Sequence, residues 1–193
     1  PGVSALVIDE FHERDLDTDL ALAFALDARS ALRDDLFIAL TSATLEASRT
    51  VSWLEDATGE EPALVDIPGD IHPLELRYAP PPRGVEAVGA IGHERVGVRR
   101  EYLSHVARTV EETLASTSGS VLVFLPGVGE IETVRGSLHL GDVPVLTLHG
   151  QLSAAEQDRA LSPASARRVI LSTSIAESSL TVPGVSVVVD AGL

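Results

Sequence analysis

Two adjacent carboxylates and a histidine follow a short apolar run near the start of the chain. Residues 5–8 are all apolar, and Asp9 and Glu10 come directly after them. His12 follows Glu10 with one aromatic residue between them. In α/β nucleotide hydrolases, a buried strand that ends in acidic residues presents a magnesium-binding group at the edge of the sheet. One carboxylate would hold hydrated Mg²⁺, and the other would orient the attacking water. An ordinary solvated strand end is the alternative explanation for the two acids.

Hydroxyl side chains stand at the end of a second apolar run. Residues 36–40 are followed by Thr-Ser-Ala-Thr, which places Ser42 and Thr44 at the end of the neighbouring predicted strand. Because parallel strands end at the same edge of a sheet, we expect these hydroxyls to meet His12 and the carboxylates. His12 could be a metal ligand, a general base or a hydrogen-bonding coupler. A plain turn that caps the next helix would also explain the hydroxyls.

Short apolar runs alternate with helical patterns, which predicts an α/β fold with parallel sheets covered by helices. The first helix is apolar nearly all round in its early turns, so we expect it to be well buried. Because an α/β domain rarely stops on a strand, we expect the chain to be cut from a longer one. The predicted strands are 5–8, 36–40, 63–67, 121–125, 143–148, 169–171 and 185–189, and the predicted helices are about 18–33, 46–55, 103–114, 127–138 and 154–161.

Proline and glycine residues divide the chain into two predicted lobes. Pro68 and Gly69, and then three consecutive prolines at 80–82, interrupt the middle of the sequence, and four glycines follow within residues 84–97. We therefore predict a first lobe of residues 1–69 and a second lobe of residues 70–193. Residues of about 80–100 are predicted to form a linker or surface insertion.

The composition limits the classes of function. The chain of 193 residues is 45% hydrophobic, as expected of a globular protein, and no apolar run is long enough to span a membrane. It contains no cysteine, which excludes disulfides and thiolate metal sites and fits a cytoplasmic location. The formal net charge of −15 argues against an extended nucleic-acid-binding surface. A narrow groove lined by a few Arg, hydroxyl and backbone N–H groups remains compatible with this charge.

All fourteen basic residues are arginine, so the chain has no lysine for a Walker A loop. Residues 125–129, Leu-Pro-Gly-Val-Gly, imitate a nucleotide-binding turn between a strand and a helix. Glu132 replaces the third glycine of a dinucleotide fingerprint, which excludes a Rossmann site. The N–H groups at the start of that helix could still bind a nucleic-acid phosphate. The G-x-S-x-G pattern of serine hydrolases is missing.

Five segments, in order, resemble the motifs of DEAH-type superfamily 2 RNA helicases, and the DEFH sequence resembles the bacterial HrpB-like branch. The resemblance covers nearly all of the chain outside residues 80–100, and it implies parts of two RecA-like lobes of P-loop NTPase type, with ATP in the cleft. The segments are VIDEFHERDLDTDLAL at 7–22 (motif II), LTSATLE at 40–46 (motif III), VLVFLPGVGEIETV at 121–134 (motif IV), LHGQLSAAEQ at 148–157, and residues 169–193 (motif V).

The resemblance also implies roles for particular residues of the first lobe. Asp9 would hold Mg²⁺ through water, and Glu10 would activate the water that hydrolyses ATP. His12, together with Ser42 and Thr44, would couple hydrolysis to movement of the lobes.

In the second lobe, the resemblance implies a track for single-stranded RNA, or DNA. Gly127, His149 and Thr173 would contact phosphate and sugar along this track. Contacts of this kind give weak sequence selectivity.

The chain departs from the family pattern in several places. The phosphate-binding motif I is expected upstream of residue 1, and the arginine-finger motif VI downstream of residue 193. In motif V, Ser174 and Ser178 replace the usual Asn and Thr, and Pro183 replaces an acidic residue. Proline removes a backbone donor at the end of motif V where the resemblance implies a nucleotide contact.

We expect the parent protein to be an ATP-dependent RNA helicase. The isolated chain should lack robust ATPase activity, because loss of the arginine finger alone costs about 10³-fold or more. The alternative is a non-catalytic nucleic-acid or protein-binding module, which the acidic charge and the altered motif V favour. An unrelated magnesium phosphohydrolase would leave the Thr-Ser-Ala-Thr segment unexplained. Open sheet edges of an incomplete lobe also predict self-association.

Overall fold

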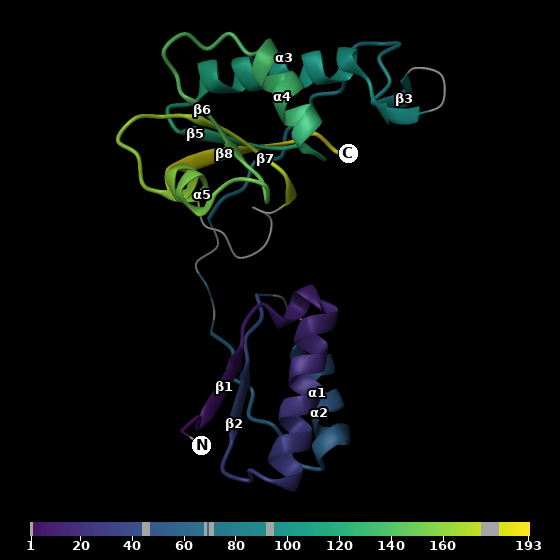
Figure 1. Ribbon diagram of the computed structural model, residues 1–193, viewed down its shortest axis with the longest axis vertical. Helices are drawn as coiled ribbons and strands as arrows, with labels where there is room; N and C mark the ends of the chain where they lie inside the picture. The colour runs from purple at the N-terminus through teal and green to yellow at the C-terminus, as the bar shows by residue number, and fades with distance from the viewer. Residues whose placement is uncertain (1, 44–46, 68, 70–71, 92–94, 175–181) are drawn as a thin grey trace. The chain divides into compact units, whose positions relative to one another are not determined.

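The computed structural model describes the whole chain except residues 1, 44–46, 68, 70–71, 92–94 and 175–181 (Figure 1). The chain divides into two compact units, Pro1–Leu74 and Glu75–Leu193, which are called the first and second units below. Among the described residues, no helix has both the length and the apolar character needed to span a bilayer.

The first unit is built on a pair of parallel strands. Its elements are β1 (Ala5–Ile8), the 3₁₀ helix η1 (Phe11–Glu13), α1 (Leu16–Ala31), β2 (Phe37–Leu40) and α2 (Ala47–Thr58). Strand β1 pairs in parallel with β2, so that Ile8 lies opposite Leu40. A small core joins this sheet to α1 and consists of Ile8, Phe11 and Leu22, with Leu6, Leu26, Ile38 and Leu40 at its margin.

Helix α1 is less buried than the sequence predicts. Leu22 is 1% exposed and Ala25 is buried, but Leu16 and Phe24 are 73% and 70% exposed. A helix on a sheet buries only one face, and the core that joins α1 to the sheet takes only Leu22 from the helix, with Leu26 at its margin. The expectation of a well-buried helix is therefore wrong.

The strand predicted at residues 63–67 is also wrong. These residues have no regular secondary structure, and Leu64, Val65 and Ile67 are all more than half exposed. A strand exists only where its backbone groups pair with a neighbour, and the sheet described in this unit contains β1 and β2 alone. The apolar residues that suggested a strand are therefore left in solvent.

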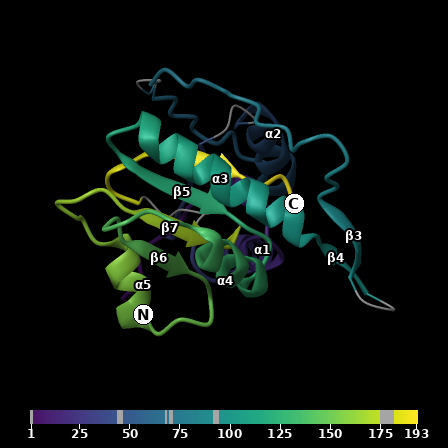
Figure 2. The same ribbon diagram turned by 90° about the horizontal axis from the view of Figure 1, so that it is seen from above.

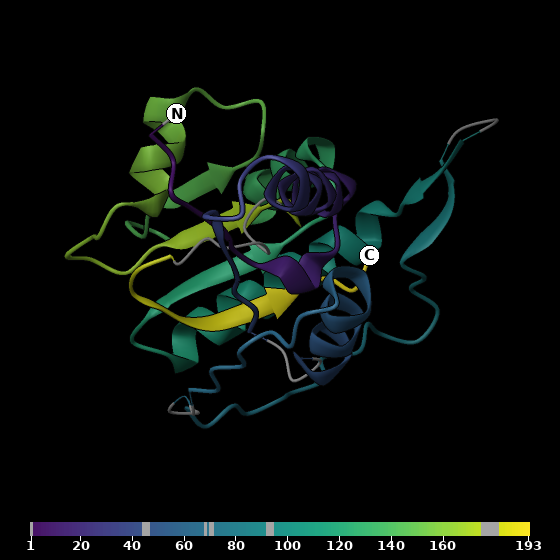
Figure 3. The ribbon, with the colours of Figure 1, turned by 90° about the horizontal axis from the view of Figure 1, so that it is seen from below.

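The second unit contains a parallel sheet with helices on both faces. Figure 1 shows α3 and α4 on one face and α5 on the other, and Figures 2 and 3 show the sheet from above and below. The strand order is β6-β7-β5-β8, and the three neighbouring pairs are parallel. The elements are β3 (Val88–Ile91), β4 (Arg95–Val98), α3 (Arg100–Ser116), β5 (Ser120–Phe124), α4 (Val128–Ser137), β6 (Val145–Leu148), α5 (Ala154–Leu161), β7 (Val169–Ser172) and β8 (Val185–Asp190).

Strands β3 and β4 form an antiparallel pair that the sequence did not predict. They fall within the glycine-rich stretch that was expected to be a linker or insertion. Gly89 leaves room for the Arg99 side chain, whose guanidinium end lies where a Cβ atom on residue 89 would be. The glycine that weakens the strand pattern in the sequence is therefore the residue that admits the arginine.

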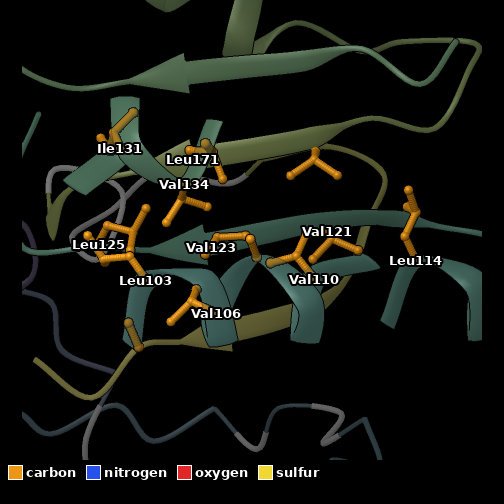
Figure 4. Packing of buried hydrophobic residues seen from close by; sticks show 13 residues of the cluster. Leu103, Val106, Val110, Leu114, Val121, Val123, Leu125, Ile131, Val134 and Leu171 are labelled. Atoms are coloured by element: carbon orange, nitrogen blue, oxygen red, sulfur yellow. The ribbon is translucent and has the colours of Figure 1, made fainter. Parts of the chain in front are cut away.

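The main core lies between the sheet and the helices α3 and α4 (Figure 4). The apolar face predicted for α3 is confirmed, since all four of its residues are buried. Val121 and Val123 of β5 point to this core, whereas Leu122 between them points to the smaller core beneath α5. A strand buried on both faces needs an unbroken apolar run, and β5 has one. The residues labelled in Figure 4 are Leu103, Val106, Val110, Leu114, Val121, Val123, Leu125, Ile131, Val134 and Leu171.

Two adjacent arginines fix helix ends on opposite faces of this sheet. Arg167 donates from Nη1 to the carbonyl oxygens of Leu114 (3.0 Å) and Thr117 (2.9 Å) at the end of α3. Arg168, which is 5% exposed, donates to carbonyl oxygens 159 (3.2 Å) and 162 (2.6 Å) at the end of α5. Successive side chains of an extended segment point in opposite directions, and a cation suits a helix C-terminus. The two residues just before β7 therefore hold the C-terminal ends of α3 and α5, one on each face of the sheet.

Substitution Leu171→Ala should destabilise the second unit by about 2–5 kcal/mol, because Leu171 is fully buried and leaves a cavity. Hydrogen exchange during urea unfolding, read at amides of β5 and β7, measures this loss. Leu76→Ala is the matched control, since Leu76 is 76% exposed and belongs to the same unit. Equal losses in the two variants would contradict the placement of the core.

Candidate functional site

The chain turns sharply after β1 and enters η1 in a strained conformation. Glu10 (φ 52°) and Arg14 (φ 54°) flank η1, and both adopt the left-handed backbone region that residues other than glycine rarely occupy. Two backbone hydrogen bonds of 2.9 Å hold the turn, from Phe11 N to the Thr41 carbonyl and from Thr41 N to the Ile8 carbonyl. Phe11 is 3% exposed and anchors the turn in the core. The acidic residues are therefore displayed on a fixed backbone.

Asp9 is held by donors from both strand ends. Its Oδ1 atom accepts hydrogen bonds from the Thr41 hydroxyl and from the Glu10 backbone N–H, at 3.0 Å in the second case. The Thr41 hydroxyl lowers the pKa of Asp9 most, the Glu10 N–H lowers it further, and the His12 charge contributes least. These donors therefore stabilise the ionised form of the carboxyl, which is the form that binds magnesium.

His12 contacts two groups through the same ring nitrogen. Its Nδ1 atom lies 3.3 Å from Glu10 Oε2 and 3.4 Å from the backbone N of Ala43, beyond the end of β2. The nitrogen donates to Glu10 only while it carries a proton, and it accepts from Ala43 only while it does not. The two hydrogen bonds therefore exclude each other, and the position of one proton selects between them.

The structure brings Asp9, Glu10 and His12 together beside the end of β2. Ser42 is exposed at this end, and Thr44 lies outside the described residues. The contact between these two hydroxyls and His12 therefore stays a prediction. The contact that the structure does give to His12 from this segment comes from a backbone N–H group.

Thr41 is a site residue that sequence reasoning did not single out. It was included in the Thr-Ser-Ala-Thr segment, but no role was assigned to it. The strand register contains the missing signal: Ile8 pairs with Leu40, so Asp9 and Thr41 follow at the same level of two parallel strands. A hydroxyl opposite a carboxylate at that level is placed to hydrogen-bond to it.

The predicted nucleic-acid residues of the second unit lie at one edge of its sheet. His149 directly follows β6, Thr173 directly follows β7, and Gly127 starts α4 after β5. The backbone N–H of Thr173 donates to the Leu148 carbonyl at 3.1 Å, which places His149 and Thr173 at adjacent strand ends. The carboxyl edge of a parallel sheet is the usual place for ligands in α/β folds.

His149 is a buried histidine at this edge. It is 8% exposed, and its Nδ1 atom has no hydrogen-bond partner among the described residues. The next helix is fixed by a capping box, in which the Glu156 carboxylate accepts from the Ser153 N–H at 3.0 Å and from its hydroxyl at 2.6 Å. The segment from His149 to Ser153 is thus tied down at its far end.

The start of α4 already carries a carboxylate. A Cβ atom placed on Gly127 would lie 2.9 Å from Glu130 Oε2, so this carboxylate lies close to the start of α4. A nucleic-acid phosphate at the start of α4 would meet this negative charge. Beside it lies a recess of about 290 Å³, lined by Phe124, Leu125, Pro126, Ser174, Asp190 and Leu193. Ser174, one of the altered motif V residues, is therefore at the sheet edge, whereas Ser178 lies outside the described residues.

Glu156→Gln should lower the stability of the second unit at neutral pH. The hydroxyl and N–H of Ser153 lower the pKa of Glu156, so the ionised group stabilises the folded state above its ordinary pKa. This contribution is lost as the pH falls through the lowered folded-state pKa of Glu156, so the wild-type advantage should shrink and then disappear at acidic pH. Urea unfolding at a series of pH values measures it. The quantity compared is the difference in unfolding free energy between wild type and Glu156→Gln. A difference that does not change with pH, or that is as large in a Ser153→Ala background, would contradict the role given to the capping box.

Comparisons with known proteins identify the family to which this sequence is similar. The family described as helicase conserved C-terminal domain matches residues 104–193. ATP-dependent RNA helicase HrpB of Escherichia coli (strain K12) is 42% identical over 98% of this chain and 22% of that protein. ATP-dependent RNA helicase HrpA of the same organism is 33% identical over 97% of this chain and 13% of that protein. The chain thus spans about a fifth or less of the length of these relatives.

Solved structures give the same result. The crystal structure of Escherichia coli DEAH/RHA helicase HrpB matches with a TM-score of 0.74 and 41% identity, over 98% of this chain and 22% of that one. The predicted fold class is confirmed: it is an α/β fold of RecA-like type, with parallel sheets and helices. The chain belongs to the DEAH-type superfamily 2 helicases, and within them to the HrpB-like branch.

Proposed function

We propose that this chain supplies the water-activating residues and part of the RNA track of an ATP-dependent RNA helicase. The observation that carries the proposal is the cluster of Asp9, Glu10 and His12, which hydrogen bonds tie to the end of β2. The names of the relatives, ATP-dependent RNA helicases, support it. In this proposal residues 1–69 belong to the first RecA-like lobe and residues 70–193 to the second.

The donor set at β1 suits a hydrated magnesium ion on ATP. Mg²⁺ prefers oxygen ligands, keeps several waters, and is usually held by one or two carboxylates together with substrate phosphates. Among the described residues, no group of three or more Asp, Glu or His side chains could enclose a metal alone. Asp9 would hold the ion through water, and the bound ion would neutralise charge that develops on the phosphates.

Glu10 is the group that would orient and deprotonate the attacking water. Its side chain and that of His12 are about a third and a quarter exposed, so both can reach a ligand. His12 Nδ1 lies 3.3 Å from Glu10 Oε2, within reach of a proton that Glu10 takes from water. When His12 donates to Glu10, it can no longer accept a hydrogen bond from the Ala43 N–H. A proton transfer at Glu10 would therefore break a hydrogen bond at the end of β2.

The second unit is the better carrier of nucleic acid. It contains thirteen acidic residues and ten arginines, whereas the first unit contains sixteen acidic residues and four arginines. Phosphate binding requires local positive potential, so this asymmetry favours the second unit. Gly127, His149 and Thr173 at its sheet edge would contact the backbone of single-stranded RNA, or of DNA, with little sequence selectivity.

Glu10→Gln tests this function in the protein that contains this chain. The variant should lower kcat for RNA-stimulated ATP hydrolysis by about 10²–10⁴-fold, because the water loses its proton acceptor. ATP and RNA binding should stay unchanged. Glu61→Gln is the matched control, since Glu61 is exposed and lies outside the site, and it should leave kcat unchanged.

An unchanged kcat in Glu10→Gln would contradict the proposal. The absence of ATP hydrolysis in the wild-type protein, with RNA binding retained, would point instead to a non-catalytic binding module. Steady-state ATPase assays with and without single-stranded RNA, together with RNA titrations, separate these outcomes.

A further inference from the structure

The two oxygens of the Asp9 carboxylate have unequal surroundings. Oδ1 accepts both hydrogen bonds of this side chain, one from the Thr41 hydroxyl and one from the Glu10 backbone N–H. No donor among the described residues contacts Oδ2. One oxygen is therefore occupied by the protein, and the other is left for a ligand.

We propose that Thr41 is a positioning residue that fixes the Asp9 carboxylate so that Oδ2 faces the hydrated metal ion. The proposal rests on the function proposed above for Asp9. The final torsion of an aspartate side chain is broad and roughly two-fold, so an unrestrained carboxylate exchanges its two oxygens. A donor on Oδ1 removes that freedom before the metal arrives, which is how outer-shell groups orient ligands.

Thr41 is itself fixed tightly enough for this role. Its backbone N–H donates to the Ile8 carbonyl and its carbonyl accepts from the Phe11 N–H, each at 2.9 Å. A β-branched side chain also has few χ1 rotamers to choose from, so the hydroxyl has a defined direction. The hydroxyl thus links the two strand ends through a side chain as well as through the backbone.

The side chain of Thr41 contributes little else to the fold. It is exposed, and it belongs to none of the buried clusters. Thr41→Val removes the hydroxyl but keeps the size, the branching and the backbone hydrogen bonds. Thr41→Ser keeps the hydroxyl and removes the methyl group. This pair of variants therefore separates the hydrogen bond from packing.

Mn²⁺ together with a non-hydrolysable ATP analogue serves as the paramagnetic probe for the magnesium position in the protein that contains this chain. In wild type, Mn²⁺ should broaden the amide NMR signals of Glu10 and Phe11, and Asp9→Asn should abolish this broadening. Thr41→Val should bind Mn²⁺ about three-fold more weakly or worse, the loss expected when one hydrogen bond at an exposed site is removed, and Thr41→Ser should bind as wild type. Each titration is made at neutral pH, where Asp9 is ionised in every variant that retains it.

A second measurement reads the hydrogen bond without a metal. Because the Thr41 hydroxyl is the largest cause of the lowered pKa of Asp9, Thr41→Val should raise that pKa and Thr41→Ser should not. The ¹³C shift of the Asp9 carboxyl carbon reports it. If Thr41 only fills space, its replacement by valine would not change the pKa of Asp9. An unchanged pKa of Asp9 in Thr41→Val would therefore overturn the proposal.

The outcomes also distinguish this proposal from the function on which it rests. Wild-type Mn²⁺ affinity in Thr41→Val overturns the positioning role, as does a loss of affinity in Thr41→Ser with none in Thr41→Val. If the wild-type protein with the ATP analogue shows no Mn²⁺ broadening at Glu10 and Phe11, the proposed role of Asp9 is wrong, and the positioning role of Thr41 is wrong with it.

Discussion

The parallel pairing of β1 and β2 continues one residue beyond both strands, and the site of the first unit depends on this extension. Thr41 donates to the Ile8 carbonyl and accepts from the Phe11 N–H, so the turn after β1 is fastened to the end of β2. The left-handed conformation of Glu10 is costly on its own and persists because these bonds and the burial of Phe11 determine it. Strain at a carboxylate proposed to activate water fits a preorganised site.

In the second unit, the residues at the sheet edge are positioned by strand register and by charged contacts at helix ends. Its four strands are parallel, so their carboxyl ends share an edge, and the residues after β6 and β7 are placed there by register. The long connections are then fixed by charge: Arg168 holds the end of α5, and the Glu156 carboxylate holds its beginning. An eight-residue helix gains little from its own hydrogen bonds, so these contacts are what fix the two ends of α5.

The sequence was sufficient wherever a buried element carried a complete pattern. The boundaries of β1 and α5, and the buried face of α3, follow from periodicity because each element packs on a core that the chain itself supplies. The sequence was insufficient where the structure of a segment depended on which other segment lies beside it. Residues 63–67 have the composition of a strand but no described neighbour. Strand β3 was not predicted because Gly89 interrupts its apolar pattern, and that glycine leaves room for the Arg99 side chain. The role of Thr41 required the register, which local patterns do not contain.

The central claim is that Thr41 fastens the turn bearing Asp9 and Glu10 to the end of β2. Amide hydrogen exchange of Phe11, whose N–H donates to the Thr41 carbonyl, tests it most directly. Phe11 should exchange as slowly as the amides within β1, because both belong to one hydrogen-bonded pairing. Exchange of Phe11 at the rate of an unstructured peptide, while β1 remains protected, would contradict the account.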